Sequence, residues 1–155
     1  MARRTSKPEK IDEVVDAFRR SGNADAAFDN LAARRLGVNP TDLQCLSIVQ
    51  RRDGLTAGAL AAEAGLTSGA VTGVVDRLER AGYARRVRDP GDRRKVNVEV
   101  TEAFMAAGAE IWGPVKADWD AELARRFTGE QLDVVLDFLR TTGELTARHV
   151  ARLEG

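Results

Sequence analysis

Hydrophobic residues in the middle of the chain recur first with helical spacing and then with strand spacing. In segment 40–52, an apolar stripe is formed by Leu43, Leu46 and Val49. In segment 67–80 the apolar positions again follow a helical repeat, at Ala70, Val71, Val74, Val75 and Leu78. Each pattern predicts an amphipathic helix that buries one stripe. Further along, valines alternate with polar residues, which predicts a half-buried antiparallel strand with Val96, Val98 and Val100 on one face and Asn97 and Glu99 on the other.

Capping and turn residues mark where two short helices begin and end. Thr56 is an N-cap candidate for the first, and Thr67 is one for the second, which runs to Arg80. Between them, Gly65 supplies the left-handed conformation that a tight turn between helices often requires. The two helices are therefore predicted to meet in a short turn.

A strand-like, arginine-rich hairpin follows the second helix. Its strands are predicted at 85–88 and 96–100, and Pro90-Gly91 makes the turn between them. Helix, tight turn, helix and basic hairpin form the plan of a winged helix-turn-helix, which places one helix in the DNA major groove and a basic loop beside it. We therefore predict a mainly α fold with a small β-hairpin wing.

The flanking segments also read as helices. Residues 9–22 and 23–36 are helical, either as two helices or as one long helix weakened at 21–23. Thr101 caps a helix that runs to about Phe127, and the segment 128–131 fits a capping box for a last helix, 129–153. The last helix is rich in apolar residues, which are Leu132, Val135, Leu136, Leu139, Leu145, Val150 and Leu153. Such a stripe has to be covered, either by packing within one chain or by a partner subunit.

Charge is balanced overall but unevenly distributed. The 155 residues carry 24 basic and 24 acidic side chains, so the formal net charge is zero. Residues 77–95 nevertheless have a net charge of +5, and residues 96–155 have −5. A segregated field of this kind can orient a protein on DNA in spite of a neutral total.

The polar face of the predicted second helix and the hairpin supply candidate DNA contacts. Small and hydroxyl-bearing residues let a helix approach base edges closely, whereas arginine on a hairpin tip can enter a narrow minor groove. The candidate residues are Thr67, Ser68, Gly69, Ala70, Thr72, Arg77, Arg86, Asp92, Arg93, Arg94 and Lys95. Of these, Ser68, Gly69 and Thr72 are predicted to read bases, and Arg77, Arg86 and Lys95 to contact phosphates. The alternative is an ordinary amphipathic helix followed by a solvated charged surface.

The same residues make the chain resemble the MarR (multiple antibiotic resistance regulator) family of transcription factors. The resemblance rests on Leu60-Ala61, on the segments 65–72 and 76–83, on Arg86, and on the wing pattern Asp92-Arg93-Arg94. It extends more loosely upstream through 35–43 and downstream into Val100-Thr101. One departure follows the wing, where Glu102 and Ala103 stand after the threonine; it leaves the start of the next helix open.

The resemblance implies a complete architecture and a mode of action. It implies a single domain over 1–155, in which 40–101 is the winged helix-turn-helix, 102–127 is a connecting helix, and 1–36 and 128–155 form a homodimer. In the family, Asp92 and Arg94 would shape the wing, and tip arginines would reach the minor groove. The implied function is that of a ligand-responsive repressor of a pseudo-palindromic operator.

A small aromatic or lipophilic effector is a further implication of the family. Trp112, Val115 and Trp119 share one face of the connecting helix and could line its pocket, although a tryptophan pair at this spacing is more often part of a core. The identity of the effector, the operator sequence and the choice between repressor and activator cannot be read from the sequence.

Other functions have little support in the sequence. There is no phosphate-binding glycine loop and no Cys/His cluster for a metal, so neither an enzyme nor a cofactor is expected. A Cys–His nucleophile formed by Cys45 and His149 has no supporting motif, and a protein-binding module would not need an arginine-rich wing tip. Cys45 is interpreted as a small buried residue rather than a redox sensor. A single cysteine and the lack of a secretion signal indicate a cytoplasmic protein.

Overall fold

The computed structural model describes residues 6–52, 55–92 and 94–154. It begins with one long helix, α1 (Lys7–Leu36), so the two N-terminal segments form a single helix. The Ser6 hydroxyl accepts the backbone N–H of Glu9, and the Glu9 carboxylate accepts that of Ser6, so a capping box starts the helix. Gly37, with φ of 71°, ends it in the left-handed conformation.

The helix-turn-helix lies where the capping residues predicted it. α2 (Pro40–Arg51) precedes α3 (Ala57–Ala64) and α4 (Ser68–Arg80), and α4 is bent by 109° from α3. The Thr56 hydroxyl accepts the N–H of Ala59, and the Thr67 hydroxyl accepts that of Ala70. Gly65 makes the turn with φ of 65°, which confirms its predicted role.

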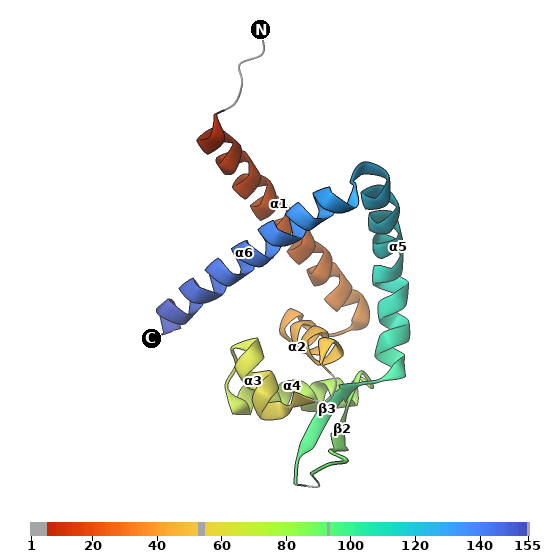
Figure 1. Ribbon diagram of the computed structural model, residues 1–155. Helices are drawn as coiled ribbons and strands as arrows, with labels where there is room; N and C mark the ends of the chain where they lie inside the picture. The colour runs from red at the N-terminus through yellow and green to blue at the C-terminus, as the bar shows by residue number, and fades with distance from the viewer. Residues whose placement is uncertain (1–5, 53–54, 93, 155) are drawn as a thin grey trace. The chain divides into compact units, whose positions relative to one another are not determined.

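The wing is a hairpin of β2 (Ala84–Arg88) and β3 (Val96–Val100), to which the structure adds a short third strand, β1 (Leu55–Thr56). The antiparallel sheet has the order β1-β3-β2, with Leu55 opposite Val98 and Arg86 also opposite Val98. The distal part of the hairpin projects away from α2, α3 and α4 (Figure 1). β1 was not predicted from the sequence, because a strand of two residues shows no periodicity.

The chain divides into two compact units, residues 1–111 and 112–155. In the first unit, the core is formed where α2, α3, α4 and the sheet meet the end of α1 and the start of α5 (Glu102–Arg126). Its largest fully buried side chains are Leu46, Leu60, Leu78, Val71, Val74, Val75, Val98 and Cys45. Phe104 joins this core and lies edge-to-face against Tyr83, with ring centroids 5.9 Å apart. The predicted buried stripes of α2 and α4 are therefore confirmed, with one exception.

That exception is Ala70, which is exposed although its spacing assigned it to the buried stripe. It lies in the first turn of α4, next to the exposed Ser68 and Gly69. The core-facing stripe of α4 begins one residue later, at the fully buried Val71.

The predicted alternation in the second wing strand is wrong at its distal end. Val98 is buried, but Val96 is 43% exposed and Asn97 is buried. Asn97 lies opposite Thr56 of β1, and its side-chain amide donates to Asp89 from the wing turn, at 2.9 Å. Val96 pairs with Arg88 at the end of the β2–β3 ladder nearest the turn, two residues from the buried Val98 on the same face.

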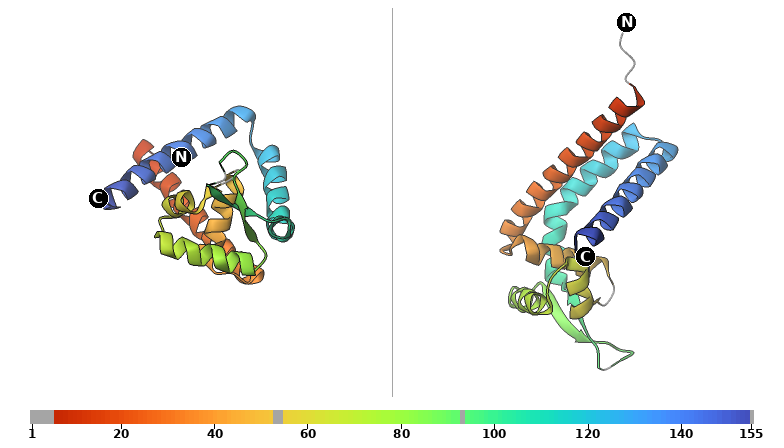
Figure 2. Two further views of the ribbon diagram at one scale, coloured as in Figure 1. Left: turned by 90° about the horizontal axis from the view of Figure 1, so that it is seen from below. Right: turned by 90° about the vertical axis from the view of Figure 1, so that its left-hand side faces the viewer.

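The second unit consists of the C-terminal part of α5 and the last helix, α6 (Gly129–Glu154) (Figure 2). Thr128 and Gln131 form the predicted capping box, since each accepts the backbone N–H of the other. None of the side chains described in this unit is buried. In the described residues no single helix is long and apolar enough to span a membrane; α3 and α4 together pass on length and composition but are sharply bent.

Candidate nucleic-acid interface

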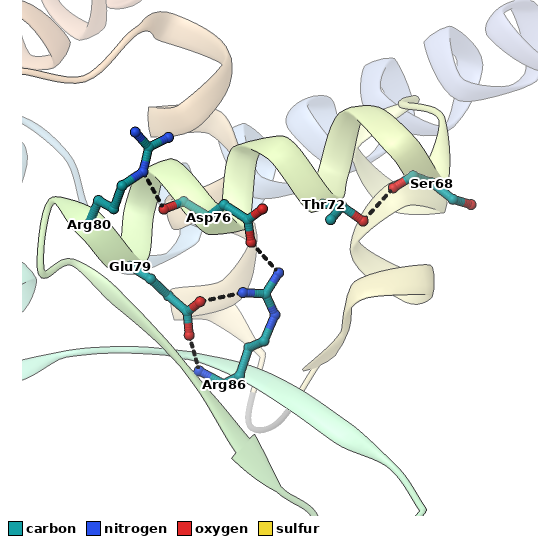
Figure 3. Close-up of polar contacts among 6 residues, drawn as sticks. All are labelled: Ser68, Thr72, Asp76, Glu79, Arg80 and Arg86. Carbon is teal, nitrogen blue, oxygen red and sulfur yellow. Dashed lines mark hydrogen bonds and ion pairs between the residues drawn. The ribbon is translucent and has the colours of Figure 1, made fainter.

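The first half of α4 presents a small polar face to solvent. Thr67, Ser68, Gly69, Ala70 and Thr72 are all exposed, as a helix that approaches base edges requires. The Thr72 hydroxyl donates to the carbonyl oxygen of Ser68 at 3.0 Å, which fixes its rotamer (Figure 3). Its oxygen lone pairs and its methyl group remain available to a base. The structure therefore presents these residues on one face, and their contact with DNA stays a prediction.

A buried carboxylate anchors the other side of α4 to α2. Asp42 is 2% exposed, and its two oxygens accept from Arg77, one from Nε at 3.0 Å and the other from Nη2 at 2.6 Å. The backbone N–H of Asp42 donates to Asn39, which caps α2. The hydrogen bond that Arg77 donates to Asp42 is the main cause that raises the pKa of Arg77. Arg77, predicted to contact phosphate, is thus first a structural tie between α2 and α4.

Arg86 joins the wing to the other end of α4. Its Nη2 donates to Asp76 at 2.8 Å and its Nη1 to Glu79, whose second oxygen accepts the backbone N–H of Arg86 at 2.9 Å (Figure 3). The bond to Asp76 is the main cause that raises the pKa of Arg86. The sequence analysis assigned Arg86 to phosphate and counted the carboxylates only as charge, so it missed this connection. The helical spacing of Asp76 and Glu79 was a signal for it, because residues three apart share a face.

The wing turn is organised around Asp89, which the sequence analysis did not single out. Its Oδ1 accepts the backbone N–H groups of Gly91, at 2.8 Å, and of Asp92, at 2.9 Å. Its Oδ2 accepts from the buried Asn97. These bonds, with the one from Asn97 first, lower the pKa of Asp89. An aspartate that begins an Asp-Pro-Gly-Asp segment is a recognisable turn signal, because its side chain can bond to backbone two residues on.

The tip of the wing exposes basic groups. Asp92 accepts from both the backbone N–H of Arg94, at 3.1 Å, and its Nε, at 3.3 Å, which agrees with the expected shaping of the loop. The Arg94 side chain remains 92% exposed. Lys95 is also exposed, and Arg93 lies outside the described residues. The wing therefore presents Arg94 and Lys95 on a turn held by two aspartates.

Cys45 lies in the core of the first unit and is fully buried, as interpreted from the sequence. Burial is the main cause that raises the pKa of its thiol, and the charge of nearby Asp42 acts in the same direction. A raised pKa and a lack of access both disfavour the thiolate that oxidant sensing requires.

The residues proposed for an effector pocket and the apolar residues of the last helix lie in the second unit, whereas the segment 1–36, which was also assigned to the dimer, lies in the first. Trp112 and Val115 are half-buried and Trp119 is 57% exposed. Most of the apolar stripe of α6 is exposed to between 41% and 47%, at Val135, Leu136, Leu139, Leu145 and Val150; Leu132 is half-buried and Leu153 is almost fully exposed.

A pocket of about 390 Å³, lined mainly by polar side chains, lies between α1 and α2 in the first unit and was not expected from the sequence. It is lined by Ala26, Asp29, Asn30, Pro40, Leu43, Gln44, Ser47 and Arg51.

Comparison with known proteins agrees with this geometry. The sequence profile of the MarR family matches residues 36–95. The chain is 34% identical to an uncharacterised HTH-type transcriptional regulator, YcgE of Bacillus subtilis (strain 168), over 99% of both chains. A solved MarR family protein from Bacillus stearothermophilus is similar in fold, with a TM-score of 0.67 and 21% identity over 92% of this chain and 99% of the other. A variant of MepR from S. aureus gives a TM-score of 0.69 and 16% identity over 85% and 96% of the two chains.

Proposed function

The chain belongs to the MarR family of DNA-binding transcriptional regulators, and from this we propose that it is a ligand-responsive repressor that binds a pseudo-palindromic operator as a homodimer. The observation that carries the proposal is the pairing of two exposed surfaces in the first unit. One is the small polar face of α4, and the other is the wing tip with Arg94 and Lys95. The first suits the major groove and the second suits the minor groove and the phosphates.

Of the DNA contacts predicted from the sequence, we propose those of the α4 face, which reads bases, and those of the wing tip. Ser68, Gly69 and Thr72 lie on the exposed face at the start of the helix. Because α4 projects this face from a well-packed core, its side chains reach a base edge without reordering the backbone. Arg94 would enter the minor groove, and Lys95 would neutralise a phosphate.

Homodimerisation is supported by the exposed apolar stripe of α6. Leu136 and Leu139 are each 46% exposed, and α1 carries further exposed apolar residues, including Ile11 and Phe18. Exposed apolar stripes on helices usually mark an interface. A two-fold pair of recognition helices would meet half-sites about one helical turn apart.

Response to a small aromatic or lipophilic molecule is proposed for the face of α5 that bears Trp112, Val115 and Trp119. The exposure of Trp119 leaves an indole available for stacking. Ligand binding there would be reported by quenching of tryptophan fluorescence, and Trp119→Ala should reduce it. A repressor would release its operator as the ligand saturates.

A catalytic role is the competing proposal and has weaker support. In the part of the chain that the structure describes, no three His, Cys, Asp or Glu side chains come together as a metal site. Cys45 is buried in the first unit and His149 lies in the second. A protein acting in the cytoplasm and bound to DNA accounts for the polar α4 face and the basic wing, which a catalytic role leaves unexplained.

The experiment is fluorescence anisotropy with duplexes from the DNA that flanks the chain's own gene, over a series of salt concentrations. We expect one duplex to bind more tightly than random DNA, with log K falling linearly against log salt. Repeating the titration with candidate aromatic ligands tests the response. Equal, salt-independent binding to every duplex would contradict a function in DNA recognition.

A further inference from the structure

Arg86 lies at the edge of the wing sheet, where it bridges two elements that the proposed function uses separately. β2 is an edge strand in the order β1-β3-β2, and edge strands leave backbone N–H groups without a strand partner. Here the N–H of Arg86 donates to Glu79 on α4. The guanidinium group donates to the second oxygen of Glu79 and to Asp76 (Figure 3). Three bonds thus join one wing residue to one face of the recognition helix.

This arrangement is poorly suited to a phosphate contact. The Arg86 side chain is 33% exposed and is flanked by two carboxylates, Asp76 and Glu79, which are 53% and 33% exposed. A phosphate that approached Arg86 would also meet the uncompensated negative charge beside it. Arg94, in contrast, is almost fully exposed.

The wing needs a support of this kind. A two-stranded ribbon is marginally stable alone, and the distal hairpin projects beyond the core of the first unit (Figure 1). Ordering a loose wing on DNA would reduce the affinity, whereas a wing held in advance avoids that loss. Arg77 already fixes α4 to α2 through Asp42, so a tie from α4 to β2 completes a rigid path from the core to the wing.

We propose that Arg86, with Asp76 and Glu79, is a positioning residue that holds the wing at a fixed place relative to the recognition helix, so that both grooves are contacted together. This rests on the proposed function, because the positioning matters only when the chain reads DNA. Arg86 acts through the two carboxylates and makes no necessary contact with DNA.

The decisive variant removes negative charge. Asp76→Asn combined with Glu79→Gln eliminates two carboxylates from the recognition helix. If Arg86 contacts phosphate, this double variant frees the arginine and binds operator more tightly. If Arg86 positions the wing, the double variant binds operator about tenfold more weakly, in spite of its more positive charge. Tighter binding would overturn the proposal.

A thermodynamic cycle separates the two roles a second time. Arg86→Ala is measured alone and in the background of Asp76→Asn with Glu79→Gln. If Arg86 positions the wing, the two carboxylate substitutions have already removed its effect on operator affinity. Arg86→Ala then causes no further loss of affinity in that background. If Arg86 contacts phosphate, Arg86→Ala would lower operator affinity equally in both backgrounds, and this result would overturn the proposal. Arg86→Lys, which retains one charged donor, should recover part of the loss.

The matched control is Arg85→Ala, in the adjacent residue of the same strand. Arg85 pairs with Glu99 within the hairpin, at 3.0 Å, and does not reach α4. It should retain operator affinity to within about twofold. Thermal unfolding of every variant should shift by no more than about 2–4 °C, because exposed ion pairs contribute little to stability. A loss of affinity in Arg85→Ala equal to that in Arg86→Ala would overturn the specific role of Arg86.

Hydrogen exchange tests the contact between Arg86 and Glu79 in the absence of DNA. A failure of the positioning proposal can therefore be distinguished from a failure of the proposed function. In the wild-type chain the backbone amide of Arg86 should exchange slowly for an amide of an edge strand, and Glu79→Ala, which removes its acceptor, should accelerate the exchange. Equal exchange in both proteins would overturn the positioning contact, whatever the chain does with DNA. Slow exchange in a chain that binds no duplex would instead contradict the proposed function.

Discussion

The first unit and α6 carry apolar residues at the same helical spacing but expose them very differently. In α4, Val74, Val75 and Leu78 are at most 2% exposed, whereas in α6 Leu136 and Leu139 are each 46% exposed. Both patterns predict a helix with one face to bury. Only in α4 does the same unit supply the surface that buries it.

The difference shows that periodicity identifies the face of a helix and not its partner. The first unit is built around its own core, which buries one face of α4 and the proximal part of the wing. The second unit has an apolar stripe and, among its described residues, none that is buried. We infer that the stripe of α6 is completed by a second copy of the chain, and each prediction below tests one side of this contrast.

The largest expected effect separates the two apolar faces by stability. Leu78→Ala removes a fully buried side chain and should lower the free energy of unfolding by about 2–5 kcal/mol. Leu139→Ala, measured at a concentration where the chain is monomeric, should cost far less, because the side chain is already half-exposed there. Urea denaturation monitored by circular dichroism provides both values. Equal losses would show that α6 is buried within its own chain.

The tip of the wing should contribute to affinity without contributing to the core. Arg94→Ala should weaken operator binding by about 2 kcal/mol, because an arginine in a narrow minor groove is lost, and should leave thermal unfolding unchanged. Asp92→Ala is the companion variant. Asp92 would be repelled by phosphate, so weaker binding on its removal indicates that it shapes the wing. Anisotropy titrations at moderate salt measure the affinity of both variants. Unchanged affinity in Arg94→Ala would show that Arg94 of the wing does not contribute to binding.

The recognition helix should determine the sequence that is read. Thr72→Ala should alter the base preference at one operator position by on the order of 1–3 kcal/mol. The variant lacks the hydroxyl and methyl groups that would contact the base edge. Competition titrations with duplexes changed one base pair at a time locate that position. A uniform loss on operator and random duplexes would instead assign Thr72 to the backbone.

The smallest effect concerns the pH dependence of the wing turn. Because hydrogen bonds lower the pKa of Asp89 in the folded chain, its contribution to the wing is present above the ordinary aspartate pKa and is lost as the pH falls through the folded value. Titration of the Asp89 carboxyl by NMR should show this lowered pKa. Asn97→Ala removes the main cause of the lowered pKa and should move the pKa of Asp89 back toward the ordinary value. Identical titrations of Asp89 in the two proteins would show that Asn97 does not cause the shift.

Most of the fold could be predicted from local signals in the sequence. Thr56, Gly65 and Thr67 mark the helix-turn-helix because each acts on backbone within a few residues, and the structure confirms them. The capping box of α6 is local in the same sense, whereas the sequence left open whether residues 9–36 form one helix or two. The two-residue strand β1 could not be predicted, because its pairing with β3 is set by tertiary structure.

The candidate site was predicted less completely, because its ties are long-range. Asp42 and Arg77 are 35 residues apart, and no periodicity connects them. The bonds of Arg86 to α4 likewise depend on where the hairpin folds back. Asn97 is buried and bonded to Asp89, whereas Val96 is exposed opposite Arg88, and a simple alternation cannot express either.

The most direct test of the central claim is sedimentation of the chain with and without an operator duplex. The stripe of α6 predicts a dimer at micromolar concentration and two chains on each pseudo-palindromic duplex. Leu139→Asp should weaken the dimer by at least about 2 kcal/mol, because it places a charge in an apolar interface, and operator affinity should fall with it. Val134→Asp is the control, since Val134 is 70% exposed and, five residues before Leu139, lies on a different face of the helix. A wild-type monomer that binds one half-site with full affinity would contradict the account.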